Sequence, residues 1–229
     1  LYIFPESSSP IKTIKKKYDL IALTPMQLNN SIFDINYIKT VLVGGSAVND
    51  NLKQKILNMS SNVFETYGMT ETATHIAVRN LSKGHNEFTA LPGVSISQRE
   101  SCLFIEPNHL SVDFVQTNDI VKLKEKNKFI LIGRKDFVIN SGGVKINPEL
   151  VEKKLSKYFK IDFVISSIDD DILGERVVLV FKRNIPTHYT IAFNCLEKYE
   201  VPKEVLAINN FPQKNGKINR AKVRSIIKN

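Results

Sequence analysis

The 229-residue sequence lacks tryptophan, has only two cysteines and contains no long hydrophobic run. Cys102 and Cys195 stand alone, without the paired spacing of a zinc site or the dense pattern of a disulfide-stabilised domain. We expect both to be buried thiols of a cytoplasmic protein. The apolar run at 177–181 is far shorter than a bilayer span, and no basic segment precedes an apolar one near residue 1. These absences argue against a membrane-inserted or secreted protein.

Acidic residues are the scarcer charged class, with 23 Asp and Glu against 32 Lys and Arg and a net charge of +9. Most of the excess follows Gly133, where 18 basic residues accompany 11 acidic ones, against 14 and 12 up to that position. The lysines lack interleaved aromatic residues and a recognition helix, so a nucleotide or polyphosphate ligand explains the charge at least as well as a nucleic acid. A merely lysine-rich surface is a further alternative. We expect no nucleic-acid partner.

Hydrophobic patterning near the start of the chain predicts an α/β arrangement. A buried strand over 39–43 leads through two glycines into a helix over 49–59, and a second strand over 62–65 ends at the polar run 66–72. Ligands of α/β sheets usually bind at the carboxyl ends of the strands. The polar run is therefore expected at a binding edge.

Later segments predict two further β-containing parts. Residues 88–131 alternate apolar and polar side chains between turn signals, which predicts a small antiparallel β subdomain. Pro148, followed by an acidic first turn, opens a helix that reaches about Phe159. The remaining predicted elements are strands over 163–168, 177–182 and 205–208, a helix over 187–199 and a last helix from 219.

Several polar residues in these segments suit nucleotide chemistry. Thr70 can donate its hydroxyl to a phosphate oxygen, Glu71 can bind a magnesium ion that bridges phosphates, and Tyr67 can stack on a base. Asp119 follows a β segment, where a carboxylate can accept both hydroxyls of a ribose. Lys217 comes after a glycine in an exposed loop and can serve as a point charge for phosphate. Taken singly, each of these residues is more simply explained as part of an ordinary turn or loop.

The segment 133–149, GRKDFVINSGGVKINPE, combines charge, apolar β-formers and a glycine pair. The run Ser141-Gly142-Gly143 permits a backbone course that a Cβ would forbid, and it lets the main chain lie against a slender ligand. The simpler interpretation is a flexible connection before the helix that starts at Pro148.

These motifs stand in a fixed order, and together they resemble the adenylate-forming superfamily of acyl-CoA synthetases, peptide-synthetase adenylation domains and luciferase. The motifs are GGSA at 44–47, YGMTET at 67–72, Asp119, GRKD at 133–136 with SGGVKINPELVE at 141–152, and NGKINR at 215–220. The resemblance covers nearly the whole chain. It implies an α/β plus α+β fold: residues 1–133 form the C-terminal portion of the large AMP-binding domain, with a parallel-sheet piece and a small antiparallel β subdomain. A mobile α+β domain over 134–229 follows.

The resemblance also implies a role for each matching residue. Lys217, Thr70 and Glu71 are implied to be catalytic, with Glu71 the magnesium ligand, and Asp136 is the implied hinge. The implied contacts to ATP, AMP and coenzyme A are Gly45, Ser46, Ala47, Tyr67, Gly68, Thr70, Asp119, Arg134, Ser141, Gly142 and Gly143. Of these, 141–143 are implied to line the pantetheine tunnel during thioester formation.

The combination of VINSGGVK with YGMTET in a compact chain looks most like the 2-succinylbenzoate CoA ligases of menaquinone biosynthesis. This resemblance implies a small carboxylic acid and CoA as partners, with Thr74 and His75 in the acyl pocket. His75 is alternatively a packed strand residue. The competing functions are a fatty-acyl or aryl CoA ligase, a carrier-protein-loading adenylation domain, and a non-catalytic AMP-binding or scaffolding fragment.

The sequence departs from the family pattern in three places. The loop rich in glycine and Ser/Thr that cradles the outer phosphates of ATP is absent and is expected upstream of Leu1. We therefore expect an N-terminally truncated fragment that binds AMP-like ligands but does not adenylate at a useful rate. Asn118 replaces the usual glycine before the ribose aspartate. Asn140 stands where many relatives carry a lysine, which argues against the luciferase-type branch.

Overall fold

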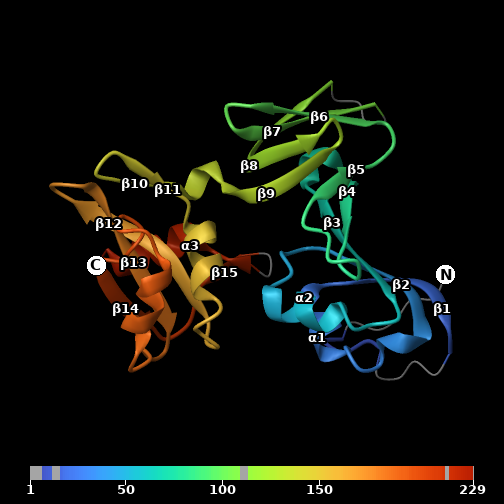
Figure 1. Ribbon diagram of the computed structural model, residues 1–229, viewed down its shortest axis with the longest axis horizontal. Helices are drawn as coiled ribbons and strands as arrows, with labels where there is room; N and C mark the ends of the chain where they lie inside the picture. Colours follow the sequence, from blue (N-terminus) through green and yellow to red (C-terminus); the bar gives the residue numbers. More distant parts are fainter. Residues whose placement is uncertain (1–6, 12–15, 109–112, 215–216, 229) are drawn as a thin grey trace. The chain divides into compact units, whose positions relative to one another are not determined.

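The computed structural model describes residues 7–11, 16–108, 113–214 and 217–228 (Figure 1). The chain divides into two compact units. The first holds the residues up to Thr117 together with 121–131, and the second holds 118–120 and the residues from Ile132 onward. Each unit contains its own clusters of buried hydrophobic residues.

Three parallel strands open the first unit: β1 (Tyr18–Leu23), β2 (Ile38–Val43) and β3 (Asn62–Gly68). The connection from β1 to β2 contains α1 (Pro25–Asn30) and the 3-10 helix η1 (Ile35–Tyr37), and α2 (Asp50–Ile56) connects β2 to β3. The predicted α/β arrangement of this part is confirmed, and the carboxyl ends of the three strands share one edge of the sheet.

Local sequence explains where the two α-helices begin. The Thr24 hydroxyl accepts a hydrogen bond from the Gln27 N–H (3.3 Å), and the Gln27 side chain accepts one from the Thr24 N–H (3.0 Å). This reciprocal capping box starts α1. Asn49 starts α2 by accepting a hydrogen bond from the Leu52 N–H (2.8 Å).

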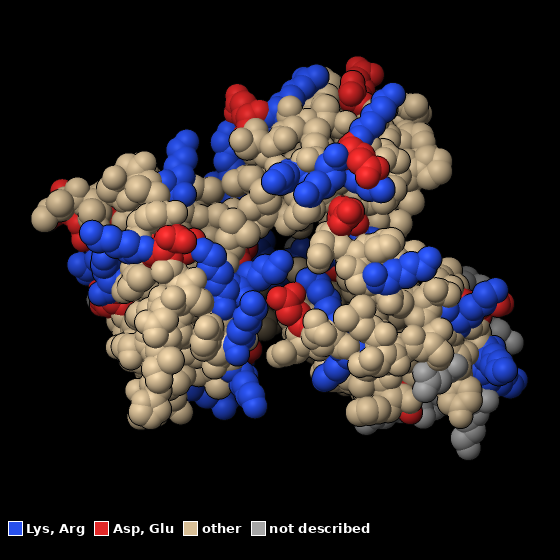
Figure 2. All heavy atoms as spheres, in the orientation of Figure 1, with Lys and Arg blue, Asp and Glu red and all other residues tan. Residues whose placement is uncertain are grey.

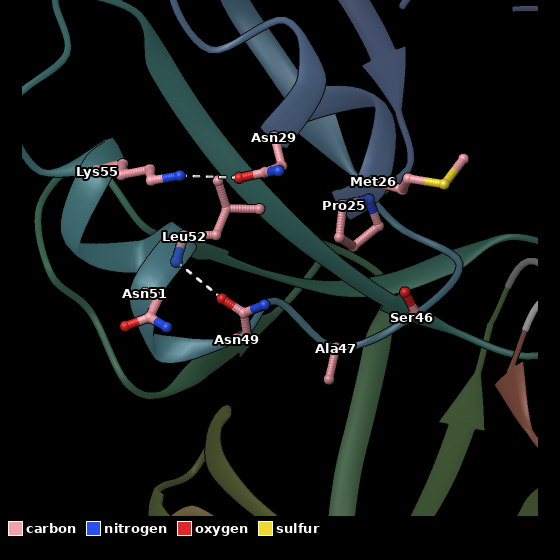
Figure 3. Close-up of a pocket in the computed structure, with 9 residues that line it drawn as sticks. All are labelled: Pro25, Met26, Asn29, Ser46, Ala47, Asn49, Asn51, Leu52 and Lys55. Carbon is pink, nitrogen blue, oxygen red and sulfur yellow. Dashed lines mark hydrogen bonds between the residues drawn. The ribbon is translucent and has the colours of Figure 1, made fainter. Parts of the chain in front are cut away.

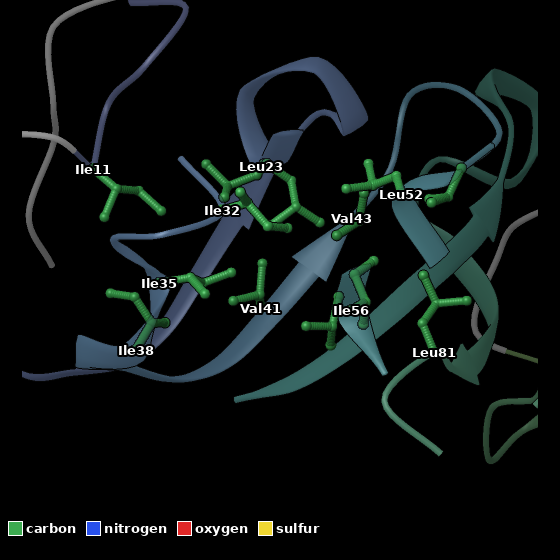
Figure 4. Packing of buried hydrophobic residues seen from close by; sticks show 13 residues of the cluster. Ile11, Leu23, Ile32, Ile35, Ile38, Val41, Val43, Leu52, Ile56 and Leu81 are labelled. Carbon is green, nitrogen blue, oxygen red and sulfur yellow. The ribbon is translucent and has the colours of Figure 1, made fainter. Parts of the chain in front are cut away.

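The core beneath the parallel strands joins their apolar faces to one side of α2 (Figure 4). Val41 and Val43 of β2 are fully buried, and so is Ile56 of α2, while Leu52 is nearly so. Each such side chain contributes about 1.5–3 kcal/mol by leaving water. This packing fixes the position of the loop between β2 and α2 at both of its ends.

Antiparallel strands complete the first sheet. They are β4 (His75–Asn80), β5 (Phe88–Ala90), β6 (Val94–Arg99), β7 (Cys102–Pro107), β8 (Val115–Glu125) and β9 (Lys128–Arg134). The strand order is β1-β2-β3-β4-β5-β9-β8-β7-β6. The 3-10 helix η2 (Thr70–Thr72) connects β3 to β4, and the pairing changes there from parallel to antiparallel. The antiparallel subdomain predicted over 88–131 is thus present.

The second unit is an α+β arrangement around the sheet β11-β10-β13-β12, with β14 parallel to β13. Its elements are η3 (Lys135–Phe137), β10 (Ile139–Ser141), β11 (Val144–Ile146), α3 (Pro148–Leu155), β12 (Phe163–Asp170), β13 (Gly174–Lys182), η4 (Tyr189–Cys195), β14 (Glu204–Ile208), β15 (Gln213–Lys214), β16 (Lys217–Ile218) and α4 (Arg220–Ile227). Val164 packs with Val223 of α4, whereas its neighbour Ile165 packs with Val151 of α3. Adjacent strand residues face opposite ways, so α3 and α4 cover opposite faces of this sheet.

The predicted α/β plus α+β fold class is confirmed, and two element predictions were wrong. The strand expected over 62–65 continues to Gly68, because Thr66 and Tyr67 pair with β4. The helix expected over 187–199 is the short 3-10 helix η4. Its sequence, YTIAFNC, is dominated by residues of weak helix propensity. The assignment of 1–133 and 134–229 as functional domains stays a prediction.

The cysteine and membrane expectations can be compared with the described residues. Cys102 and Cys195 are both free thiols; Cys102 is buried as expected, whereas Cys195 is only half-buried. Among the residues that the structure describes, no helix is both long enough and apolar enough to cross a membrane.

Candidate active site

The loop after β2 lies against the neighbouring strands. The Gly44 N–H donates to the Leu23 carbonyl (3.1 Å), and Gly45 has a φ of +89°, a conformation that favours glycine. A Cβ on Gly44 would lie 2.6 Å from the Thr66 hydroxyl, which itself donates to the Val43 carbonyl (3.2 Å). Gly44 of the GGSA motif therefore allows the loop to approach β3 closely, and Gly45 provides the positive φ of the turn.

A buried ion pair holds the far end of this loop. Glu65 is 4% exposed, and the Arg79 guanidinium donates to its Oε2 through Nε (2.8 Å) and Nη2 (2.6 Å). The Glu65 Oε1 accepts a hydrogen bond from the Val48 N–H (3.3 Å), so the pair connects β3 and β4 to the loop. Arg79 also lies 4.4 Å from the centre of the Phe88 ring. The sequence analysis did not predict this pair. Its only signal was Glu65, a single charged residue within the apolar segment NVFETY.

The turn after β3 is tightly packed. The β3–β4 register shifts between Tyr67 and Gly68, and a Cβ on Gly68 would lie 2.5 Å from the Thr74 carbonyl oxygen. The Thr72 hydroxyl accepts a hydrogen bond from the Met69 N–H (3.1 Å) and donates one to the Thr74 carbonyl oxygen (2.9 Å). This turn directs Thr70 and Thr74 toward one hollow.

That hollow, which we call the turn pocket, has a volume of about 320 Å³. It brings together five residues that the sequence predicted: Gly45, Gly68, Thr70, Thr74 and His75. The sequence reasoning missed its other lining residues, which are Thr66, Met69 and Ala73. Gly45 of the GGSA loop and residues of the YGMTET turn thus line one cavity at the carboxyl end of the parallel strands.

A second cavity, of about 440 Å³, is lined by residues of α1, of the loop after β2 and of α2 (Figure 3). Ser46 and Ala47, both predicted contacts, line it together with residues of the two helices. Lys55 donates to the Asn29 Oδ1 (3.1 Å) at its wall. The sequence held no signal for the α1 wall, because the contact depends on how α1 packs beside α2.

Two predicted residues of the YGMTET run lie outside both cavities. Tyr67 is 8% exposed, and its ring centre lies 5.7 Å from that of Phe88 and 5.3 Å from that of Phe129. Glu71 is exposed. Among the described residues, no group of three or more His, Cys, Asp or Glu side chains could hold a metal alone. A single exposed carboxylate fits Mg²⁺, which keeps several waters and binds largely through substrate phosphates.

In the second unit, Arg134 forms ion pairs with both Asp119, the predicted ribose contact, and Asp136, the predicted hinge. Its Nη1 lies 3.0 Å from the Asp119 Oδ1, and its Nη2 lies 2.6 Å from the Asp136 Oδ2. Asn118, which departs from the family pattern, donates from Nδ2 to the Asp136 Oδ1 (2.9 Å). Asp119 is largely buried, so its carboxylate is held in a defined position. The structure therefore brings Asp119, Arg134 and Asp136 together.

The residues before and after this group have their own local constraints. A Cβ on Gly133 would lie 2.6 Å from the Glu149 Oε2, so glycine leaves room for α3. Burial raises the pKa of Glu149, and the positive charge of Arg220 opposes that rise. Gly142 and Gly143 have φ values of 60° and 82° and form the turn between β10 and β11. That turn belongs to a paired hairpin, not to a flexible connection.

Lys217 lies in β16, in the short ribbon that β15 and β16 form, and its side chain is exposed. Three residues later, Arg220 forms two hydrogen bonds with the Glu152 carboxylate (2.8 and 2.5 Å) and lies 5.3 Å from the centre of the Phe137 ring. The predicted site residues are thus divided between the two units: Gly45 to His75 lie in the first, and Asp119 to Lys217 in the second.

No family model matches the chain. The 2-succinylbenzoate–CoA ligase of Staphylococcus epidermidis is 24% identical over 219 residues, which are 82% of this chain and 46% of the relative. The Staphylococcus aureus ligase of the same name is 24% identical over 243 residues, 89% of this chain and 48% of that relative. The chain spans about half the length of the curated relatives it matches.

Solved structures of acyl-CoA synthetases also resemble this chain. The o-succinylbenzoate CoA synthetase of Bacillus subtilis with ATP and a magnesium ion matches with a TM-score of 0.77 and 19% identity, over 89% of this chain and 51% of that one. The chain has the fold of the AMP-forming acyl-CoA synthetases. A synthetase-like protein of Dyadobacter fermentans is 29% identical with a TM-score of 0.55, over 97% of this chain and 69% of that one. The resemblance to acyl-CoA synthetases seen in the sequence is confirmed, and the roles of individual synthetase residues stay predictions.

Proposed function

We propose that the natural polypeptide is an AMP-forming acid–CoA ligase, which activates a carboxylic acid with ATP and passes the acyl group to coenzyme A. One observation carries this proposal: Gly45 of the GGSA loop and residues of the YGMTET turn line a single cavity in a fold shared with acyl-CoA synthetases. The order of the remaining motifs along the chain supports it.

In the first half-reaction, a carboxylate oxygen of the acid attacks the α-phosphorus of ATP, and the bond to pyrophosphate breaks. The exposed ammonium group of Lys217 is placed on a short ribbon, where it can stabilise the charge that develops on these oxygens. Thr70 lines the turn pocket and can donate its hydroxyl to a phosphate oxygen. Glu71 would hold Mg²⁺, which neutralises phosphate charge when bound.

In the second half-reaction, the CoA thiol, having lost its proton, attacks the acyl carbon, and AMP leaves. Asp119 can accept hydrogen bonds from both ribose hydroxyls, with Arg134 at 3.0 Å fixing the carboxylate. Asp136 is the proposed hinge between the half-reactions. The hairpin turn at 141–143 is the proposed wall of the pantetheine tunnel.

The proposed acid is 2-succinylbenzoate, and the step belongs to menaquinone synthesis. Two curated relatives carry this activity in their names. Within the chain, Thr74 and His75 line the turn pocket and offer polar partners, one of them able to carry positive charge, to the second carboxylate of the substrate.

The test uses the natural polypeptide in its full length with ATP, magnesium, CoA and a panel of acids: 2-succinylbenzoate, benzoate and medium-chain fatty acids. Mass spectrometry detects any acyl-CoA formed. We expect 2-succinylbenzoyl-CoA as the main product. A product from the other acids alone would keep the ligase and reject this substrate, whereas no product from any acid would support the non-catalytic alternative.

A further inference from the structure

Two lysines face each other across the ribbon that carries Lys217. In the antiparallel pairing of β15 with β16, Lys214 lies directly opposite Lys217. Residues directly opposite in an antiparallel pair project from the same face, with their Cβ atoms about 4.5–5.5 Å apart. The register therefore sets two ammonium groups side by side.

This placement is electrostatically unfavourable without a ligand. Both side chains are exposed, and within the described part of the chain neither forms an ion pair. Some other lysines of the same unit have carboxylate partners, for example Lys154 with Glu200 and Lys228 with Asp169. Like charges directly opposite each other destabilise a strand pair. An anion between the two lysines would remove that cost.

Hydrogen bonds and an ion pair attach the base of the ribbon to the rest of the second unit. The Asn219 N–H donates to the Pro212 carbonyl (2.8 Å), and the Asn219 side chain caps α4 by accepting from the Lys222 N–H (3.1 Å). Arg220 ties the start of α4 to Glu152 of α3. Figure 2 shows that lysine and arginine side chains are common on the visible surface of this unit, which adds a field that attracts anions.

We propose that Lys214 is a second cationic residue of the adenylation step and donates to a phosphate oxygen of ATP beside Lys217. The assignment rests on the proposed function. As the acid oxygen bonds to the α-phosphorus and the electron pair of the breaking bond passes to pyrophosphate, negative charge is spread over more than one oxygen. Two ammonium groups on one face can each approach a different oxygen of that group.

The experiment compares Lys214→Ala, Lys214→Arg and the exposed control Lys160→Ala in the full-length natural polypeptide. ATP–pyrophosphate exchange reports adenylation, and the reaction of preformed acyl-adenylate with CoA reports the second half-reaction. We expect Lys214→Ala to slow exchange about tenfold or more, Lys214→Arg to recover most of the rate, and the control to be unchanged. The second half-reaction should be unaffected in all three.

Normal exchange in Lys214→Ala, or an equal loss in both half-reactions, would overturn the assignment alone. In the first case Lys214 has no role in the step, and in the second its role is structural. An absence of exchange and of acyl-CoA formation in the unsubstituted polypeptide would instead overturn the proposed function, and the assignment with it.

Discussion

Replacing Lys217 by alanine is expected to slow adenylate formation by about 10²–10³-fold, the usual cost of removing one donor that stabilises charge in a transition state. Lys217 lies on an exposed two-stranded ribbon. Its loss should leave the fold of the second unit intact, because that fold depends on buried clusters to which Lys217 does not contribute. ATP–pyrophosphate exchange with the full-length natural polypeptide measures the effect.

As a control, the rate of the thioester-forming half-reaction is measured in the same variant, starting from preformed acyl-adenylate. We expect this rate to be nearly unchanged in Lys217→Ala, since the proposed charge stabilisation belongs to the first step. Circular dichroism checks that the variant is folded. A folded variant with unchanged exchange would remove Lys217 from the catalytic machinery.

Replacing Arg79 by methionine is expected to lower the free energy of unfolding of the first unit by roughly 3–5 kcal/mol. The substitution leaves the Glu65 carboxylate buried without its cation; in the native protein the two side chains are 5% and 11% exposed. The same loss should loosen the loop after β2, because the Glu65 carboxylate also accepts a hydrogen bond from the Val48 N–H. Urea unfolding followed by circular dichroism gives the free energy, which suits a chain without tryptophan.

Two control variants distinguish the effect of leaving a buried charge unpaired from the effect of removing any ion pair. Lys128→Met removes an exposed ion pair with Glu125 in the same unit and should cost less than about 1 kcal/mol. The double variant Arg79→Met with Glu65→Gln should recover part of the stability, since no buried charge then remains unpaired. Equal effects of Arg79→Met and Lys128→Met would show that the Glu65–Arg79 pair does not hold the loop.

The sequence predicted those parts of the fold in which the local sequence pattern and the tertiary packing favour the same secondary structure. The apolar run of β2 and the helical pattern that follows the glycine pair are local signals, and both elements form close to the expected positions. The parallel arrangement followed from strands separated by helical segments. Where the pattern was weak, as in the segment of η4, tertiary packing selected a 3-10 helix instead.

Candidate site residues were predictable where glycines and polar residues interrupt apolar strands. Thr70 was found in this way, whereas the roles of Gly45 and His75 came from the resemblance to acyl-CoA synthetases; the structure places all three around one cavity. The Glu65–Arg79 pair was not predictable, because its partners are 14 residues apart on two strands and their meeting depends on the β3–β4 register. Likewise, the opposition of Lys214 and Lys217 depends on a pairing that only the structure shows.

The most direct test of the central claim, that this chain carries the nucleotide-binding part of an adenylate-forming site, is a calorimetric titration of the 229-residue chain with AMP. We expect binding that weakens about tenfold or more in Asp119→Asn, since hydrogen bonds to a charged group are worth about 1.5–3 kcal/mol. The exposed control Asp113→Asn should bind like the unsubstituted chain. No AMP binding, or binding that Asp119→Asn leaves unchanged, would contradict the account.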